Sequence, residues 1–111
     1  MTNRAKAEGD EAEREVAALI NDLLGINCRR ALGAGRKDDV GDVYGVPHTV
    51  IQVTRIRDFT RAIREKLAKT EAQRKNAGAT FAALWVRLYG KRYVVVMTPE
   101  QWATYHREAM S

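Results

Sequence analysis

The sequence predicts a single α/β domain in which a mixed sheet is flanked by helices. Segments with apolar residues at helical spacing alternate with short β-branched runs, in the order α-β-β-β-α-β-β-α. The length of 111 residues suits one domain, and a chain of this size buries roughly two-thirds of its unfolded surface without disulfide or metal support. An order of this kind places helices on the faces of a sheet.

The first predicted element is a helix that follows a polar segment, residues 1–9, which we expect to be frayed. Asp10 can cap its N-terminus, and Gly25 can end it as a C′ glycine. Glu13 borders the apolar stripe of this helix, and acids in the first turns also suit the helix dipole. The stripe that we expect to be buried consists of Ala12, Val16, Leu19, Ile20, Leu23 and Leu24.

A first strand is predicted over residues 26–32, and a charged loop with two glycines follows over 33–39. The loop is not a P-loop, because neither the Walker spacing nor a following helix is present. Arg36 and Lys37 are candidates for phosphate contacts. A solvated loop without a ligand is the alternative.

The second and third strands are predicted over 42–44 and 49–55, joined by a turn over 45–48. Asp42 follows Gly41 directly at the start of the second strand. Gln52 and Thr54 lie two residues apart on the third strand and therefore share one face. A carboxylate on one strand beside two oxygen-bearing side chains on the next is an arrangement that suits a hard cation such as Mg²⁺.

The second half of the chain predicts a helix over 58–76, strands over 81–88 and 92–97, and a final helix. The strand over 81–88 is continuously apolar, as expected for a strand that is covered on both faces. Thr98 at the N-cap, with Gln101 three residues later, predicts a capping box. We expect the second helix to end at Gly78 and to bury Phe59, Ile63, Leu67 and Thr70.

The charge is concentrated on the second helix and the turn before it. The net charge is +5, and the segment 55–75 carries eight Lys or Arg residues against three acids, an excess equal to the net charge of the whole chain. This concentration predicts a surface that follows phosphates, so we expect a nucleic acid partner. The alternative is a solvated helix face with the pairs Glu65–Lys69 and Glu71–Lys75.

The sequence also excludes several classes of protein. Cys28 is the single cysteine, so no internal disulfide can form and we expect a reducing compartment. No apolar run reaches the length of a membrane span, and the N-terminus lacks the apolar h-region of a signal peptide, so we expect a cytoplasmic protein. His48 and His106 have no partner at metal-ligand spacing, and we expect a turn residue and an exposed helix residue.

The run Ala12-Glu13-Arg14-Glu15, Arg30, Asp42 after a glycine-rich loop, and Gln52-Val53-Thr54 together resemble the PD-(D/E)XK nucleases. Within them, the chain resembles most the archaeal-type Holliday junction resolvases and their short phage relatives, over about residues 8–97. The resemblance implies a restriction-endonuclease-like fold, with Glu13, Asp42 and Gln52 as ligands of Mg²⁺ or Mn²⁺ and Thr54 as the fourth residue of the catalytic set. Together with the charge pattern, it implies the following nucleic-acid-binding residues: Arg14, Arg30, Arg36, Lys37, Arg55, Arg57, Arg61, Arg64 and Lys66.

Two positions depart from the family pattern. Gln52 replaces a carboxylate with a neutral amide, which lowers the expected metal affinity. Thr54 stands where the family has a lysine that orients water and offsets charge on the phosphate. Arg55 is adjacent but points to the opposite face, so Lys66 and Lys37 are the better substitutes.

Three functions follow from these observations. The first is a Mg²⁺-dependent, structure-selective DNA endonuclease of the Holliday junction resolvase type, phage-encoded, homodimeric and acting in the cytoplasm of the host cell. The second is a protein with the nuclease fold that has lost catalysis and only binds DNA. The third is a structural or host-interaction protein that reuses the fold.

Overall fold

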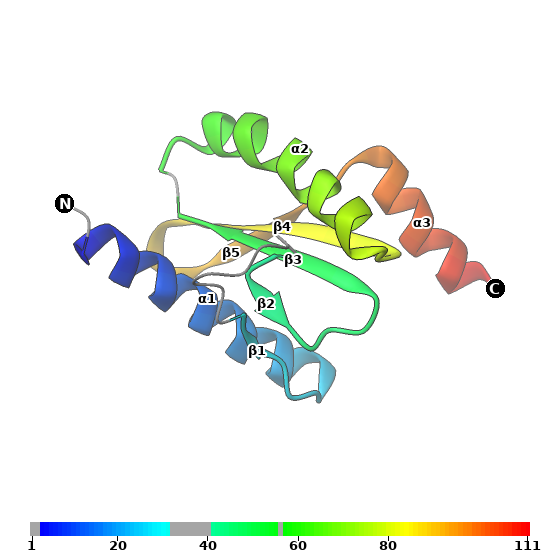
Figure 1. The fold of residues 1–111 in the computed structure, drawn as a ribbon, viewed down its shortest axis with the longest axis horizontal. Coiled ribbons are helices and arrows are strands. Elements are labelled where there is room, and N and C mark those ends of the chain that lie inside the picture. The colour runs from blue at the N-terminus through cyan, green and yellow to red at the C-terminus, as the bar shows by residue number, and fades with distance from the viewer. Residues whose placement is uncertain (1–2, 32–40, 56) are drawn as a thin grey trace.

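The computed structural model describes residues 3–31, 41–55 and 57–111. It confirms an α/β domain with a five-stranded mixed sheet and three helices in the predicted order (Figure 1). The elements are α1 (Asn3–Leu24), β1 (Arg29–Arg30), β2 (Val43–Tyr44), β3 (Thr49–Thr54), α2 (Phe59–Ala77), β4 (Phe81–Arg87), the 3₁₀ turn η1 (Tyr89–Lys91), β5 (Tyr93–Val96) and α3 (Pro99–Met110).

The strands lie in the sheet in their chain order, β1-β2-β3-β4-β5. The central pair β3–β4 is parallel, with Thr49 opposite Phe81 and Thr54 opposite Val86, and the other three pairs are antiparallel. The helix α2 makes the crossover that a parallel pair requires. Helices α1 and α2 cover opposite faces of the sheet, and α3 lies beside the end where β4 begins (Figure 1).

The alternation of side chains along β3 and β4 divides the core into two clusters. Ile51, Val53 and Ala83 pack against α1. Leu84 and Val86 point to the other face and pack against Ala62 of α2. Because both faces of β4 are covered, the strand is apolar at successive positions, as predicted.

Helix α1 differs from its prediction at its N-terminus. It begins at Asn3, within the segment that we expected to be frayed, and Asp10 lies inside the helix instead of capping it. The good helix formers around Gly9 outweigh the cost of about 1 kcal/mol that one glycine brings. Gly25 ends the helix as predicted, with φ of 67° and its N–H bonded to the carbonyl of Asn21.

The predicted apolar stripe of α1 is only partly buried. Ala12, Val16 and Ile20 are buried together with Ala17, whereas Leu19, Leu23 and Leu24 are exposed. A helix of 22 residues is about 33 Å long, and the seven-residue strand β4 spans only about 23 Å. The helix is therefore longer than β4. Leu24 in its last turn lines an open apolar groove with Ile51 of β3 and Trp85 of β4, so the leucine is exposed although it lies beside the sheet.

The first strand is shorter than predicted because a side chain replaces strand pairing at its start. Asn21 of α1 donates from Nδ2 to the carbonyl of Cys28 and accepts from the N–H of Cys28 at 2.9 and 2.7 Å. Pairing with β2 therefore begins only at Arg29. Residue 32, the predicted end of this strand, lies outside the described residues.

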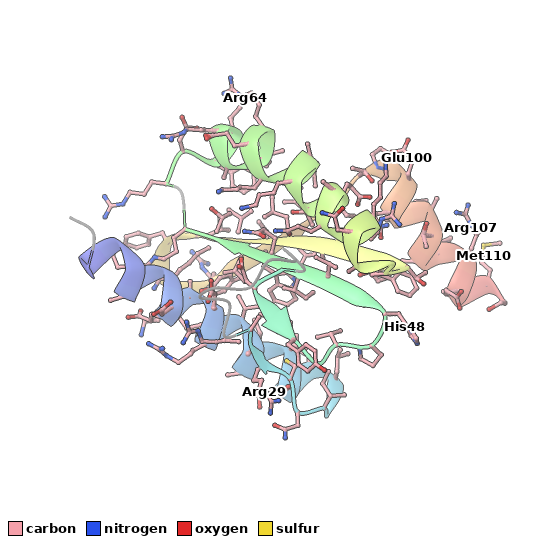
Figure 2. The ribbon with its side chains drawn as sticks, viewed as in Figure 1. Arg29, His48, Arg64, Glu100, Arg107 and Met110 are labelled. Atoms are coloured by element: carbon pink, nitrogen blue, oxygen red, sulfur yellow. The ribbon has the colours of Figure 1, made fainter. Side chains whose placement is uncertain are left out.

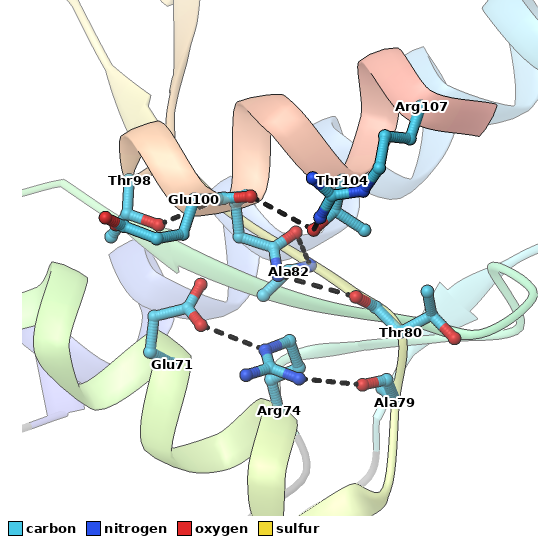
Figure 3. Close-up of polar contacts among 10 residues, drawn as sticks. Glu71, Arg74, Ala79, Thr80, Ala82, Thr98, Glu100, Thr104 and Arg107 are labelled. Carbon is cyan, nitrogen blue, oxygen red and sulfur yellow. Dashed lines mark hydrogen bonds and ion pairs between the residues drawn. The ribbon is translucent and has the colours of Figure 1, made fainter. Parts of the chain in front are cut away.

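Helices α2 and α3 confirm most of their predicted boundaries. Gly78 ends α2 in the left-handed conformation, but Phe59 at its start is exposed, and Ala62 takes the inward position. Thr98 caps α3 by accepting from the N–H of Gln101, as predicted. The capping box is not completed, because the Gln101 amide accepts from the N–H of Ala82 and donates to the carbonyl of Thr80 (Figure 3). Within the described residues, no helix is long and apolar enough to cross a membrane.

Candidate functional site

Asp42 is fixed at the start of β2 by three contacts. Its N–H donates to the carbonyl of Ile51 at 2.7 Å, and its own carbonyl accepts from Ala31 at 2.9 Å. Its side-chain Oδ2 accepts from the N–H of Val53 at 2.9 Å. Gly41 permits this close approach, because its φ is 103° and a Cβ there would lie 2.8 Å from the Ile51 carbonyl oxygen. The carboxylate is thus held against the middle of β3.

Glu13 approaches Asp42 from α1. Its Oε1 accepts from Nε of Arg30 at 3.2 Å, and the same guanidinium binds Asp10 at 2.8 Å through Nη2. Burial raises the pKa of Glu13, and the negative charge of Asp42 raises this pKa further, while Arg30 acts in the opposite direction. Two carboxylates that repel each other in this way are an arrangement that a divalent cation would stabilise.

Gln52 and Thr54 are both buried on β3, each with 6% of its surface exposed. They share the face of the sheet that packs against α2, since their neighbours on β4 are Leu84 and Val86. The Oε1 atom of Gln52 has no hydrogen-bond partner in the described part of the chain. Buried acceptors are nearly always satisfied, and a bound ion or water is the usual explanation for an exception.

The predicted donors have the chemistry that a hard cation needs, but the structure brings only two of them to the same side of the sheet. Two carboxylates and one amide oxygen are the ligand types that Mg²⁺ and Mn²⁺ take in proteins. Within the described residues, however, no three His, Cys, Asp or Glu side chains are arranged to hold a metal ion. The structure also does not bring the Gln52 amide to Glu13, because Gln52 shares the face of Leu84 and α2, whereas Glu13 lies on α1 at the opposite face. Any site in this part of the chain therefore rests on Glu13 and Asp42.

Arg30 is the cation that lies beside Glu13 and Asp10, whereas the sequence analysis predicted it only as a DNA contact. Arg30 lies on β1 next to α1 and touches Glu13 directly. Its position in the strand after the first helix was the available signal. Lys66 is half-buried on α2, and Arg55 turns toward α1, where Nη1 donates to the carbonyl of Glu8 at 3.1 Å. The predicted orientation of Arg55 is therefore confirmed, whereas Arg36 and Lys37 lie outside the described residues.

The basic residues are spread over several surfaces. Arg64 points outward from α2, and Arg29 lies on the opposite side of the molecule (Figure 2). Two arginines of α2 form ion pairs that the sequence did not predict, Arg61 with Glu65 at 2.7 Å and Arg74 with Glu71 at 2.9 Å. Arg14 and Arg57 are exposed.

The comparisons with known proteins add no relative. The sequence matches no protein-family model, and comparison with curated proteins and with solved structures gives no match.

Proposed function

We propose that this protein is a metal-dependent DNA endonuclease with the PD-(D/E)XK fold, acting on branched DNA as Holliday junction resolvases do. The observation that carries the proposal is the fixed placement of two carboxylates, Glu13 on Arg30 at 3.2 Å and Asp42 on the Val53 N–H at 2.9 Å. The resemblance of the sequence to the resolvases supports it, and so does the net charge of +5.

The residues of the chain would divide the work as follows. Asp42, oriented by the Val53 N–H, and Glu13 would hold the metal, and water would complete its coordination, because Gln52 faces α2 on the other side of the sheet. When bound, Mg²⁺ or Mn²⁺ would polarise the scissile phosphate and activate a water molecule. Arg30, fixed between Glu13 and Asp10, would offset negative charge near the acids.

The replacement of the motif lysine by Thr54 should lower the rate of DNA cleavage. A buried threonine carries no charge and cannot offset the charge that develops on a phosphate. Arg30 supplies a positive charge from the side of α1, although it is already shared between two acids. We therefore propose a slow enzyme, with Mn²⁺ supporting cleavage better than Mg²⁺ because the ligand set has only two carboxylates.

A four-way junction has two-fold symmetry, so we propose that the enzyme cuts it as a homodimer. The second candidate is a DNA-binding protein of the same fold without catalysis. The observation that favours it is Thr54, which is buried at the position where the resolvases have their lysine. Metal dependence separates the two candidates.

The test is cleavage of a labelled four-way junction and a matched linear duplex with Mg²⁺, with Mn²⁺ and with EDTA. We expect metal-dependent cutting of the junction that Asp42→Ala abolishes while binding stays nearly unchanged. The control is Asp22→Ala, which removes an exposed aspartate of α1 and should leave cutting intact. Salt-sensitive binding without any cutting would support the second candidate, and cutting by Asp42→Ala would overturn the site.

A further inference from the structure

A pocket opens at the carboxyl ends of the parallel strands β3 and β4. It has a volume of about 570 Å³, within the range of pockets that hold small ligands. Its lining includes Arg55, Arg57 and Arg87, the exposed ring of Phe59 and the ring of Tyr89. The pocket is separate from the candidate catalytic site, because it is not lined by Glu13, Asp42, Gln52 or Thr54.

The three arginines come together because the two strands are parallel. Arg55 directly follows β3, Arg87 is the last residue of β4, and Arg57 precedes α2. The sequence separates Arg87 from the other two by about thirty residues, so charge patterning did not associate them. Glu8 is the single acid that lines the pocket among the described residues, which leaves the lining positively charged.

The guanidinium groups of Arg87 and Arg55 are held in place by contacts with α1. Arg87 donates from Nε to Glu15 at 3.2 Å, and Arg55 uses Nη1 for the Glu8 carbonyl and for Glu11 at 3.8 Å. Burial opposes the ionisation of Glu15, but bonds from Tyr93 and Arg87 outweigh it and lower its pKa. A guanidinium has five N–H donors, so each arginine keeps donors for a ligand.

The aromatic rings are presented without a partner ring. Tyr89 is 92% exposed at the tip of the β4–β5 hairpin. The hairpin is closed by the Leu88 N–H on the Arg92 carbonyl at 2.6 Å, and Gly90 and Lys91 both have positive φ. Neither Tyr89 nor Phe59 belongs to an aromatic pair within the described residues. A tight turn thus holds a bare ring beside three arginines.

We propose that this arginine–tyrosine pocket binds one unpaired nucleotide of a DNA strand, with the arginines on its phosphate and the base stacked on Tyr89. Arginine forks match phosphate oxygens, and exposed rings stack on bases without regard to sequence. Bases inside a duplex have both faces covered, so the ligand is a nucleotide at a branch point or in a single strand. The inference rests on the proposed function only in that DNA is the ligand.

The test compares two fluorescent single-stranded oligonucleotides of about 12 nucleotides, one normal and one abasic, by anisotropy in EDTA. The abasic strand keeps the phosphates and lacks the bases. We expect Tyr89→Ala to weaken binding of the normal strand by about 5- to 150-fold, the loss of one base–aromatic stack, and to change binding of the abasic strand less than about twofold. Tyr89→Phe should retain most of the affinity.

Two matched controls distinguish the pocket from general surface effects. Tyr44 is a second exposed tyrosine, on β2, and Tyr44→Ala should leave both affinities unchanged. Arg57→Gln should lower the slope of log Kd against log salt by about 0.7 for both strands, as expected for one lost phosphate contact on single-stranded DNA. Arg107→Gln, an exposed arginine on α3, should lower it less.

Each outcome decides the proposal. Equal binding of the normal strand by the wild type and by Tyr89→Ala would overturn it, as would equal losses in Tyr44→Ala. Stronger competition by an acidic peptide than by the normal strand would assign the pocket to a protein partner and overturn it as well. The binding assay contains EDTA and does not depend on cleavage. Tyr89-dependent binding in EDTA, together with no junction cleavage in the separate assay with Mg²⁺ or Mn²⁺, would therefore refute the endonuclease and leave the pocket established.

Discussion

Replacing Gln52 by leucine separates the stability of the fold from the candidate metal site. Gln52 is buried beside Leu84, and its Oε1 accepts no hydrogen bond in the described part of the chain. Leucine has a similar volume and no polar atom. The substitution therefore removes an unsatisfied acceptor on the α2 face and leaves Glu13 and Asp42 unchanged.

The magnitude follows from the burial. An unsatisfied buried acceptor costs about 1–3 kcal/mol, and the change of shape to leucine costs less than about 1.5 kcal/mol. We expect a net gain of about 1 kcal/mol in the free energy of unfolding without metal. For 111 residues, this gain raises the melting temperature by about 4 °C. In the wild type, Mg²⁺ at ten times its Kd should add about 1.4 kcal/mol, and it should add about as much in Gln52→Leu, because Gln52 lies on the opposite face of the sheet from Glu13.

The assay is thermal unfolding in EDTA and in a series of Mg²⁺ concentrations. Gln73→Leu is the matched control, because Gln73 is a buried glutamine of α2 that is not part of the candidate site. It should keep the Mg²⁺ response whatever its own stability. Asp42→Asn should lose the response. A variant Gln52→Leu that is less stable in EDTA, or that loses the Mg²⁺ response, would refute the reasoning.

Three further substitutions test the fold around the site. Because the pKa of Glu13 is raised, the folded protein binds its proton more tightly than the unfolded chain, and wild-type stability falls as pH rises from 4.5 through the raised pKa. Glu13→Gln should remove this component from urea unfolding measured between about pH 4 and 8, and identical pH profiles would contradict it. Gly41→Ala should cost about 1–3 kcal/mol, since its Cβ would meet the Ile51 carbonyl, whereas Gly25→Ala, with open space around it, should cost less in the same assay. Gln101→Met should cost about 1–3 kcal/mol because it leaves the Ala82 N–H without its acceptor, and an unchanged denaturation midpoint would show that this bond is unimportant.

Local physical chemistry determined much of this protein from its sequence. Helical and β-branched periodicity gave the element order, and Thr98 and Gly78 marked helix ends correctly because capping depends on a few adjacent residues. Gly41 before Asp42 indicated a turn. In the structure its φ is positive, and the absence of a Cβ lets its backbone lie close to Ile51 of β3. The alternation on β3 placed Gln52 and Thr54 on one face.

Tertiary structure decided which of these side chains meet. The sequence could not show that Leu23 and Leu24 stay exposed, because their burial depends on how closely α1 packs on strands that are distant in the sequence. The packing of α3 against β4 makes the Gln101 side chain the acceptor for the Ala82 N–H, so it does not complete the capping box. Parallel alignment of β3 and β4 brings Arg87 and Tyr89 beside Arg55, and α1 brings Arg30 to Glu13. Contacts between residues far apart in the chain leave no local periodicity, so only the folded chain reveals them.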